Sequence, residues 1–305
     1  MKKISKTVVF FGSGPVAAAS LQKLHQDFNI EAIVTKPRAP HHKGSVPVIE
    51  LAEELDIAYH TVDSKQTLDA LIATQPFKSD IAVLIDFGII VSRQVIDYFK
   101  LGIINSHFSI LPEWRGADPI TYAILSGQKS TGVSLMKVNE AMDEGPLIAY
   151  DEYDIPSDID TPHLTKALIS LSHELLCKNI PLYIQGKIAA FAQDSTGRPI
   201  SYSRKISSAD AMLNFSKTAD ELAREIRAYK GWPGSKLTIG DKSIIITKAH
   251  VVDMPLSKGQ TKIIDKDKLM IGTKDKSLSV DEVRPAGKTT MPIKAFLAGN
   301  SHLLR

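Results

Sequence analysis

The sequence contains a single cysteine, Cys177, among its 305 residues. An internal disulfide is therefore excluded, and no set of cysteines is present that could form a metal site. No apolar run approaches the ~18 residues that a membrane-spanning helix requires. We therefore expect a cytoplasmic protein with no metal ion and no membrane partner. Nothing in the sequence demands an oligomer, so we expect a monomer.

Two further absences exclude common functions. No serine or cysteine is flanked as in the nucleophile elbow of a hydrolase, so a covalent intermediate is not expected. The glycine-rich turn at 12–17 (GSGPVA) formally matches the dinucleotide fingerprint, but the second predicted strand ends in 35–38 (TKPR) without the acidic residue that would bind a ribose. Pro15 also removes one N–H group that could face a pyrophosphate. A tight turn that lets a neighbouring loop approach is the favoured interpretation.

The charge is unevenly distributed along the chain. Residues 205–305 contain 18 Lys and Arg against 11 Asp and Glu, a net charge of +7, whereas residues 1–204 have a net charge of −4. A basic C-terminal part indicates contact with a polyanion. A solvated, lysine-rich surface is the alternative, and charge alone does not decide between them.

The first half alternates between predicted strands and helices. Apolar runs predict strands at 7–11, 30–35, 57–61, 81–85 and 101–104, with helices at 16–25, 48–55, 67–74 and 92–99 between them. This alternation predicts a Rossmann-like, doubly wound, mostly parallel α/β sheet. In such sheets ligands bind beyond the carboxyl ends of the strands.

Three polar side chains with useful chemistry stand near the ends of two predicted strands. Asn105 and His107 follow the strand at 101–104, and Asp143 follows an apolar segment at 133–138. An amide can hold a carbonyl oxygen that gains negative charge, and an imidazole can polarise it or move a proton. If the strands are neighbours, this set suits transfer of a small carbonyl group to an amine. The alternative is that these residues are ordinary turn formers.

The same stretch contains an ordered series of motifs. They are N-S-H at 105–107, S-I-L-P at 109–112, R-G at 115–116, T-G-V at 131–133 and D-E-G at 143–145. In this order and spacing they resemble the folate-dependent formyltransferases. The resemblance implies 10-formyltetrahydrofolate as the co-substrate and Asn105, His107 and Asp143 as catalytic residues. It also implies folate contacts from Phe87, Gly88, Ser109, Ile110, Leu111 and Pro112. Asp86 departs from the family pattern and has no predicted role.

The second half predicts a separate small domain. A strand at 150–155 and a long helix at 160–185 complete a catalytic domain over 1–190, and the loop-like segment 191–204 is expected to be a linker. Short strands are predicted at 235–239, 243–251, 259–265, 268–273 and 277–283. Five short strands separated by turns favour an OB-like β-barrel over 205–305.

This C-terminal region resembles the corresponding domain of the methionyl-tRNA formyltransferase family, through residues 205–210, 226–229, 232–234 and 285–288. The resemblance implies initiator methionyl-tRNA as the acceptor, with the basic domain along its backbone. Candidate tRNA contacts are Lys36, Arg38, Lys43, Arg204 and Lys205. Two alternatives are a nucleotide-amino-sugar N-formyltransferase that uses the same donor, and an RNA- or NAD-binding protein that has kept the fold without the activity.

Overall fold

The computed structural model describes residues 7–38, 44–240 and 242–300. It consists of two compact units. Unit 1 comprises Met1–Gly116, Ser130–Asp154 and Thr165–Ser203, and unit 2 comprises Ala117–Lys129, Ile155–Leu164 and Arg204–Arg305. Two short segments that precede residue 190 therefore group with the C-terminal part of the chain.

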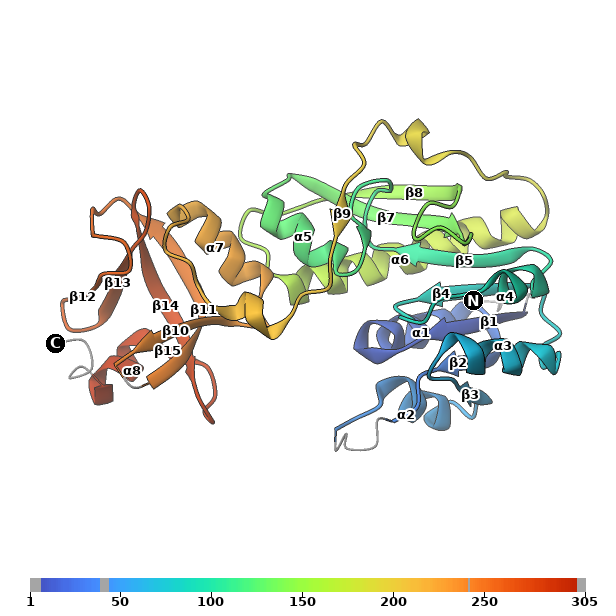
Figure 1. Ribbon diagram of the computed structural model, residues 1–305, viewed down its shortest axis with the longest axis horizontal. Helices are drawn as coiled ribbons and strands as arrows, with labels where there is room; N and C mark the ends of the chain where they lie inside the picture. Colours follow the sequence, from blue (N-terminus) through green and yellow to red (C-terminus); the bar gives the residue numbers. More distant parts are fainter. Residues whose placement is uncertain (1–6, 39–43, 241, 301–305) are drawn as a thin grey trace. The chain divides into compact units, whose positions relative to one another are not determined.

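Unit 1 is built on a seven-stranded sheet (Figure 1). Its strands are β1 (Thr7–Gly12), β2 (Asn29–Thr35), β3 (Tyr59–Thr61), β4 (Ile81–Ile85), β5 (Gly102–His107), β7 (Ser130–Lys137) and β8 (Leu147–Asp154). Their order is β3-β2-β1-β4-β5-β7-β8. The first five pair in parallel, and β7 and β8 are antiparallel to their neighbours. This confirms the mostly parallel α/β sheet predicted from the alternating pattern.

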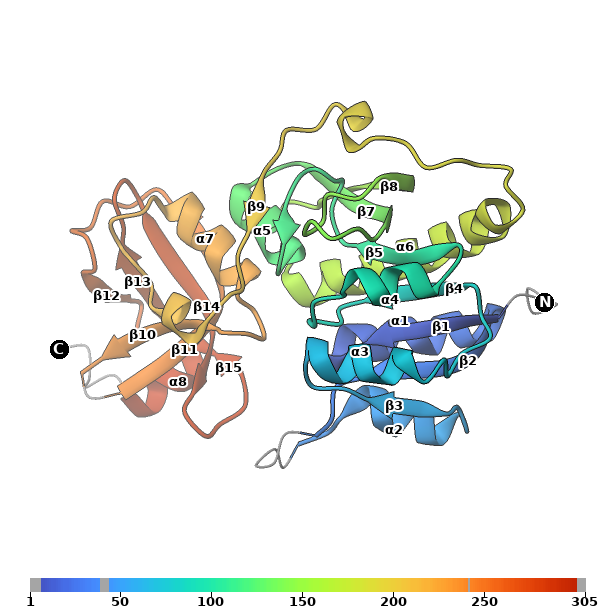
Figure 2. The ribbon, with the colours of Figure 1, turned by 45° about the vertical axis from the view of Figure 1, so that its right-hand side comes forward.

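The helices of unit 1 connect these strands. They are α1 (Gly14–Asp27), α2 (Pro47–Glu54), α3 (Lys65–Ala73), α4 (Arg93–Tyr98) and the long α6 (Thr161–Ile184), whose first turn belongs to unit 2. Leu68 of α3 and Val95 of α4 pack with Phe11 of β1 and Ile103 of β5 in one apolar cluster. Figure 2 shows these two helices in front of the strands. Since side chains alternate along a strand, Asn105 and His107 lie on the same face of β5 as Ile103.

Strand β5 is longer than the sequence pattern predicted. The apolar run ends at Ile104, but the strand continues to His107. The neighbouring strands explain the difference: β4 pairs with Asn105, and β7 pairs with Asn105, Ser106 and His107. Asn105 is therefore held by strands on both sides and His107 by β7 alone, and neither is part of a loop.

The glycine-rich turn after β1 is a packing feature. A Cβ at Gly12 would lie 2.6 Å from the Phe10 ring, 2.7 Å from the Ala17 Cβ and 2.8 Å from the Ile85 carbonyl oxygen. The backbone N–H of Ser13 donates to the Asp86 carbonyl at 2.9 Å. Glycine here allows the loop after β4 to approach, as the favoured interpretation predicted.

Unit 2 contains a curled antiparallel sheet. Its strands are β10 (Ser235–Ile239), β11 (Lys242–Val252), β12 (Thr261–Ile264), β13 (Lys268–Gly272), β14 (Ser277–Pro285) and β15 (Met291–Pro292), and its helices are α5 (Pro119–Ser126), α7 (Ala219–Ala228) and α8 (Ile293–Asn300). The order is β10-β11-β14-β13-β12, with β15 on β14. Register shifts in β11 near Lys248 bend the sheet. This half-barrel confirms the OB-like architecture.

An apolar cluster lies at the centre of unit 2. Leu222 and Ile226 of α7 pack with Ile246 of β11, Val280 of β14 and Phe296 of α8. Within the described residues, no helix is both long enough and apolar enough to cross a bilayer.

Candidate active site

The structure brings Asn105, His107 and Asp143 together in unit 1. Asn105 and His107 are buried in β5, and Asp143 lies in the connection between β7 and β8. Asp143 Oδ1 is 3.4 Å from Asn105 Nδ2, a long hydrogen bond, and 3.9 Å from His107 Nδ1. The three groups thus surround one small volume, although their sequence positions span 38 residues.

The Asp143 carboxylate is held in place by the backbone. Its Oδ2 accepts a hydrogen bond from the Gly116 N–H at 2.7 Å. Asp143 itself has φ 53°, a left-handed conformation that costs energy for a residue with a side chain. One carboxylate oxygen is therefore fixed by Gly116, and the other is directed at Asn105 and His107.

The orientation of the His107 ring follows from its second nitrogen. Nε2 lies 2.9 Å from the carbonyl oxygen of Trp114. Because a carbonyl only accepts hydrogen bonds, Nε2 carries a proton and donates it. Nδ1 is consequently the nitrogen that faces Asp143 and is available for proton transfer.

A buried pair that the sequence analysis missed supports the Asp143 loop. Gln193, in the short 3-10 helix Gln193–Thr196, donates through Nε2 to the carbonyls of Asp143 and Gly145, each at 2.8 Å. Its Oε1 accepts from Arg115 at 2.8 and 3.2 Å, and Arg115 forms an ion pair with Glu144 at 3.2 Å. Gln193 therefore joins the two loops that carry Gly116 and Asp143.

The segment predicted to be a linker also contacts the site. Strands β6 (Arg115–Gly116) and β9 (Tyr202–Ser203) pair in parallel. The Ser201 hydroxyl accepts from the Trp114 N–H at 2.9 Å. Residues up to Ser203 belong to unit 1. This part of the chain thus holds the loop whose backbone contacts both His107 and Asp143.

Gln193→Ala is expected to lower both stability and kcat. The substitution leaves the buried Arg115 guanidinium and two loop carbonyls without this partner, at a cost of about 1–3 kcal/mol for each unsatisfied group. Gln193→Glu is the matched variant, because it keeps an acceptor for Arg115 and loses the two N–H donors to the loop. Urea unfolding measures the structural role on both variants, and the kinetics of the formyl transfer that the resemblance implies measure the positioning role. Wild-type kcat in Gln193→Ala would contradict the positioning role.

The residues predicted to contact folate are mostly buried. Phe87 lies in the core, with its ring 5.3 Å from that of Phe11, and all four side chains of 109–112 are buried. Gly88 is exposed, and its carbonyl accepts a hydrogen bond from Lys36 Nζ at 2.8 Å. The 109–112 segment, which follows His107 closely in the chain, is thus buried in this structure. Direct folate contact by these residues stays a prediction.

Strand β7 fixes the 109–112 segment. The Ser134 hydroxyl donates to the Ser109 carbonyl at 2.8 Å and accepts from the Leu111 N–H at 3.0 Å. A Cβ at Gly132 would lie 2.4 Å from Ile110 Cδ1 and 2.1 Å from the Asp151 carbonyl oxygen. The glycine of the T-G-V motif is therefore required by the close approach of this segment and β8.

The candidate tRNA contacts have different surroundings. Lys36 is engaged with Gly88 as described, and Arg38 donates to the Gly44 carbonyl at 3.1 Å and lies 3.8 Å from Glu50. Lys43 lies outside the described residues. Arg204 forms an exposed ion pair with Asp210, which raises the pKa of Arg204 and lowers that of Asp210, and Lys205 is exposed. No two of these cations share a partner among the described residues, so their role stays a prediction.

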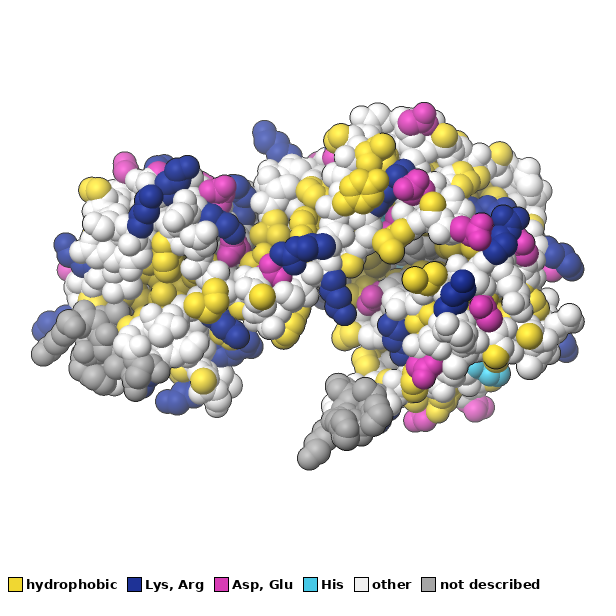
Figure 3. Space-filling model, viewed as in Figure 1, with side chains coloured by type: hydrophobic (Ala, Val, Ile, Leu, Met, Phe, Trp, Pro, Cys, Tyr) yellow, Lys and Arg dark blue, Asp and Glu magenta, His cyan; other side chains and the backbone are white. Residues whose placement is uncertain are grey.

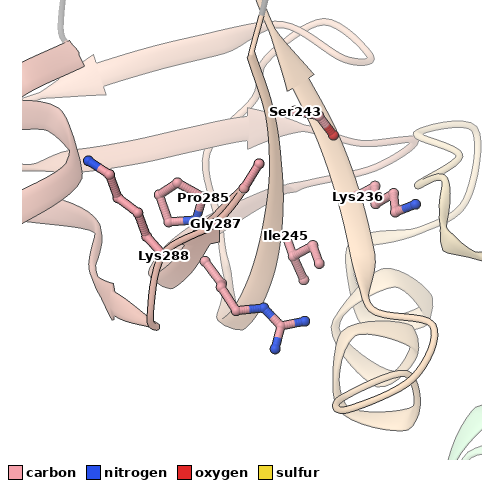
Figure 4. A pocket seen from close by; sticks show the side chains of 8 residues that line it. Lys236, Ser243, Ile245, Pro285, Gly287 and Lys288 are labelled. Carbon is pink, nitrogen blue, oxygen red and sulfur yellow. The ribbon is translucent and has the colours of Figure 1, made fainter. Parts of the chain in front are cut away.

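A basic cavity lies on the curled sheet of unit 2. It has a volume of about 330 Å³ and includes Lys236, Arg284 and Lys288 around Ile245. Figure 4 shows Lys236 and Lys288 on opposite sides of Ile245. Other Lys and Arg side chains are distributed over the visible face of this unit (Figure 3). The arrangement suits anionic groups bound at several points.

Comparison with known proteins identifies the family. Residues 5–180 match the family described as Formyl transferase, and residues 205–301 match Formyl transferase, C-terminal domain. A methionyl-tRNA formyltransferase of Pseudoalteromonas translucida is 31% identical over 96% of this chain and 94% of its own length. One of Clostridioides difficile is 30% identical over 96% and 97%. The chain belongs to the methionyl-tRNA formyltransferase family.

Solved structures share the fold of this family member. An N-formyltransferase from Helicobacter canadensis, in complex with folinic acid and dTDP-3-aminofucose, has a TM-score of 0.67 at 21% identity and covers 90% of this chain and 98% of its own. HypX from Aquifex aeolicus with tetrahydrofolic acid has a TM-score of 0.66 at 13% identity and covers 97% and 47%. These likenesses concern the fold, and both neighbours were crystallised with folate derivatives.

Proposed function

We propose that the protein transfers the formyl group of 10-formyltetrahydrofolate to the α-amine of initiator methionyl-tRNA, with tetrahydrofolate as the second product. The observation that carries the mechanism is the placement of Asp143 within 3.4 Å of the Asn105 amide and 3.9 Å of the His107 ring. Relatives named methionyl-tRNA formyltransferase, matched over nearly their whole length, support the choice of acceptor.

The reaction has a simple atom balance. The neutral amine nitrogen attacks the formyl carbon, and the formyl oxygen gains negative charge. The Asn105 Nδ2–H donates to this oxyanion, which is the kind of stabilisation that contributes most to such transfers. The amine loses a proton to Asp143, the bond from the formyl carbon to N10 breaks, and Asp143 returns the proton to N10 as tetrahydrofolate leaves. No covalent enzyme intermediate is needed.

His107 acts through Nδ1 in this mechanism. Nε2–H is already engaged with the Trp114 carbonyl, so a contribution from His107 to the oxyanion requires a proton on Nδ1. Asp143 Oδ1 lies 3.9 Å from the same nitrogen, close enough for a direct electrostatic interaction with the ring. Asp143 thus holds the site geometry and receives the amine proton.

Unit 2 supplies the positive charge that attracts the phosphate groups of the tRNA. Residues 205–305 carry a net charge of +7, and Lys236, Arg284 and Lys288 line one cavity in this region. Phosphate contacts of this kind position a nucleic acid without reading its sequence. A charged-tRNA acceptor also fits a cytoplasmic enzyme.

The acceptor is tested by offering two amines with the same donor. Purified protein is incubated with 10-formyltetrahydrofolate and either charged initiator tRNA or a nucleotide-linked amino sugar. We expect N-formylmethionine from the tRNA and no saturable formylation of the sugar. The reverse result would replace the proposed acceptor with an amino sugar, and activity with neither would overturn the function.

The salt dependence of tRNA binding tests the role of the basic cavity. Affinity is expected to fall linearly on a log–log plot against salt, with a slope of about −0.7 to −0.9 for each phosphate contact. Replacing Lys236, Arg284 and Lys288 together with glutamine should make the slope shallower by about 2 to 3. Lys258→Gln, an exposed lysine outside the cavity, is the control. An unchanged slope in the triple variant would remove these residues from the interface.

A further inference from the structure

Three metal-binding side chains converge in unit 1 on two helices. Asp27 is the last residue of α1, and His173 and Cys177 lie one turn apart on α6, so their side chains share a face of that helix. His173 Nε2 is 3.0 Å from Asp27 Oδ2, and Cys177 Sγ is 3.7 Å from the same nitrogen. All three ligand atoms lie within 4.8 Å of one another.

We propose that Asp27, His173 and Cys177 form a binding site for one Zn²⁺ ion. Tetrahedral zinc with ordinary bond lengths separates a ligand nitrogen and oxygen by about 3.3 Å and a nitrogen and sulfur by about 3.5 Å. The observed separations of 3.0 and 3.7 Å differ from these by only about 0.3 Å. The same sulfur lies 3.8 Å from His173 Nδ1 and so faces the ring, and the His173 ring must turn to direct Nε2 between Asp27 and Cys177 when the ion binds. A cysteine cluster was excluded by the sequence, but one thiolate suffices when an imidazole and a carboxylate complete the set.

The donor set and its exposure indicate the kind of site. A thiolate, an imidazole and a carboxylate together suit zinc, whereas magnesium and calcium prefer oxygen ligands alone. The side chains of Asp27 and His173 are 17% and 18% exposed, and Cys177 is partly buried. Water thus has access to the fourth position, and the ion has a path to the ligands.

Two simpler interpretations account for less of the geometry. A reactive thiol accounts for the sulfur alone and gives no role to the imidazole and the carboxylate beside it. An ion pair between His173 and Asp27 alone would leave the adjacent Cys177 sulfur unexplained. The exposed His250–Asp281 ion pair, for comparison, has no cysteine in a cluster with it. Among residues 7–38, 44–240 and 242–300, the Asp27 group is the single cluster of three such ligands.

Metal binding would join α1 to α6 on the side of β5 opposite to Asn105 and His107. Ser172, next to His173, shares a 2.7 Å hydrogen bond with Ser106, which lies between Asn105 and His107 in β5. An ion at this point would anchor α6 at the turn that contacts the back of β5. The thiol releases one proton to solvent as it binds the ion, and no redox step is involved. The expected effect is on stability, and the transfer chemistry remains with the opposite face of the strand.

Cobalt(II) is the probe that tests the site in the full-length protein. After treatment with a chelator and a phosphine reductant, titration with Co²⁺ should give visible bands of tetrahedral intensity and a sulfur-to-cobalt charge-transfer band, both saturating at one equivalent. Because the sequence has a single cysteine, this charge-transfer band can arise only from Cys177. Added Zn²⁺ should displace the cobalt and abolish both bands. Absence of the charge-transfer band in excess Co²⁺ would overturn the proposal without reference to any variant.

Variants separate this site from adventitious binding. Cys177→Ser should abolish the charge-transfer band, and Asp27→Asn should weaken cobalt binding by at least about 10-fold. Zn²⁺ should raise the Tm of the wild-type protein and leave that of Cys177→Ser unchanged. His250→Asn, in the exposed pair on unit 2, should behave as wild type. An equal zinc-dependent Tm shift in Cys177→Ser would assign the effect to binding elsewhere and contradict the proposal. Formyl-transfer activity is measured alongside, and its presence or absence does not bear on this result.

Discussion

Asn105→Ala is expected to lower kcat for formyl transfer by about 10²- to 10³-fold, the usual effect of removing one donor to an oxyanion. The amide is buried in β5 and faces the Asp143 carboxylate, so water does not readily replace it. The pairing of β5 with β4 and β7 uses backbone groups, and the strand should form without this side chain. Steady-state kinetics with charged initiator tRNA, together with thermal unfolding, measure both effects.

Asn29→Ala is the matched control for this substitution. Asn29 is an exposed asparagine at the start of β2 whose Nδ2 donates to Thr7 Oγ1 at 3.1 Å. The Asn29→Ala substitution removes a side-chain amide of the same kind from another strand of the same sheet, and it should leave kcat unchanged. A folded Asn105→Ala protein that turns over like the wild type would sink the assignment of Asn105 as a catalytic residue.

Gly145→Ala is expected to reduce kcat by about 10²-fold and stability by about 1–3 kcal/mol. A Cβ at this position would lie 1.8 Å from the Lys137 carbonyl oxygen and 3.0 Å from its carbonyl carbon, so the backbone of the β7–β8 connection must move. Overpacking costs free energy of this order, and a displacement of about 1 Å at a catalytic group costs this factor in rate. Asp143 lies two residues away and would shift with the loop. Kinetics and urea unfolding measure the two losses.

Gly299→Ala tests whether the effect is local to the site. Gly299 lies in α8, and a Cβ there would have nothing within 4 Å. This substitution should leave kcat as it is and stability equal or slightly higher. If Gly145→Ala also left kcat and unfolding unchanged, the close contact with Lys137 would not control the position of Asp143.

Local patterns in the sequence predicted much of the sheet and the convergence of the central residues. The apolar run at 81–85 matches β4 in full, and 235–239 matches β10. Asn105, His107 and Asp143 could be grouped because each follows an apolar run, and the runs proved to be neighbouring strands. Periodicity alone does not distinguish a strand end from a strand that continues through polar residues, so β5 was predicted too short.

Contacts between distant segments could not be predicted in the same way. Gln193 bonds to Gly145 across 48 residues and to Asp143 across 50, from a segment whose Ser, Thr, Gly and Pro residues indicate a loop. Hydrophobic periodicity is read over a short window of sequence, so it cannot indicate a hydrogen-bond partner about 50 residues away. Helix α5 was missed for a different reason: its sequence, PITYAILS, is apolar at most positions and has no charged residue, so it shows no polar face that would mark a helical period. Arg115, in contrast, belongs to the R-G motif at 115–116, and that motif could have marked it as a candidate residue of the site.

Formyl transfer to charged initiator tRNA by the purified wild-type protein tests the central claim most directly. Donor labelled in the formyl group is supplied with methionyl-tRNA, with the same tRNA uncharged, and with the Asn105→Ala protein in parallel. The account predicts label on the methionine nitrogen, recovered as N-formylmethionine after hydrolysis of the ester, with none on uncharged tRNA and far less with the variant. Label that never reaches methionine, or that reaches it equally with Asn105→Ala, would contradict it.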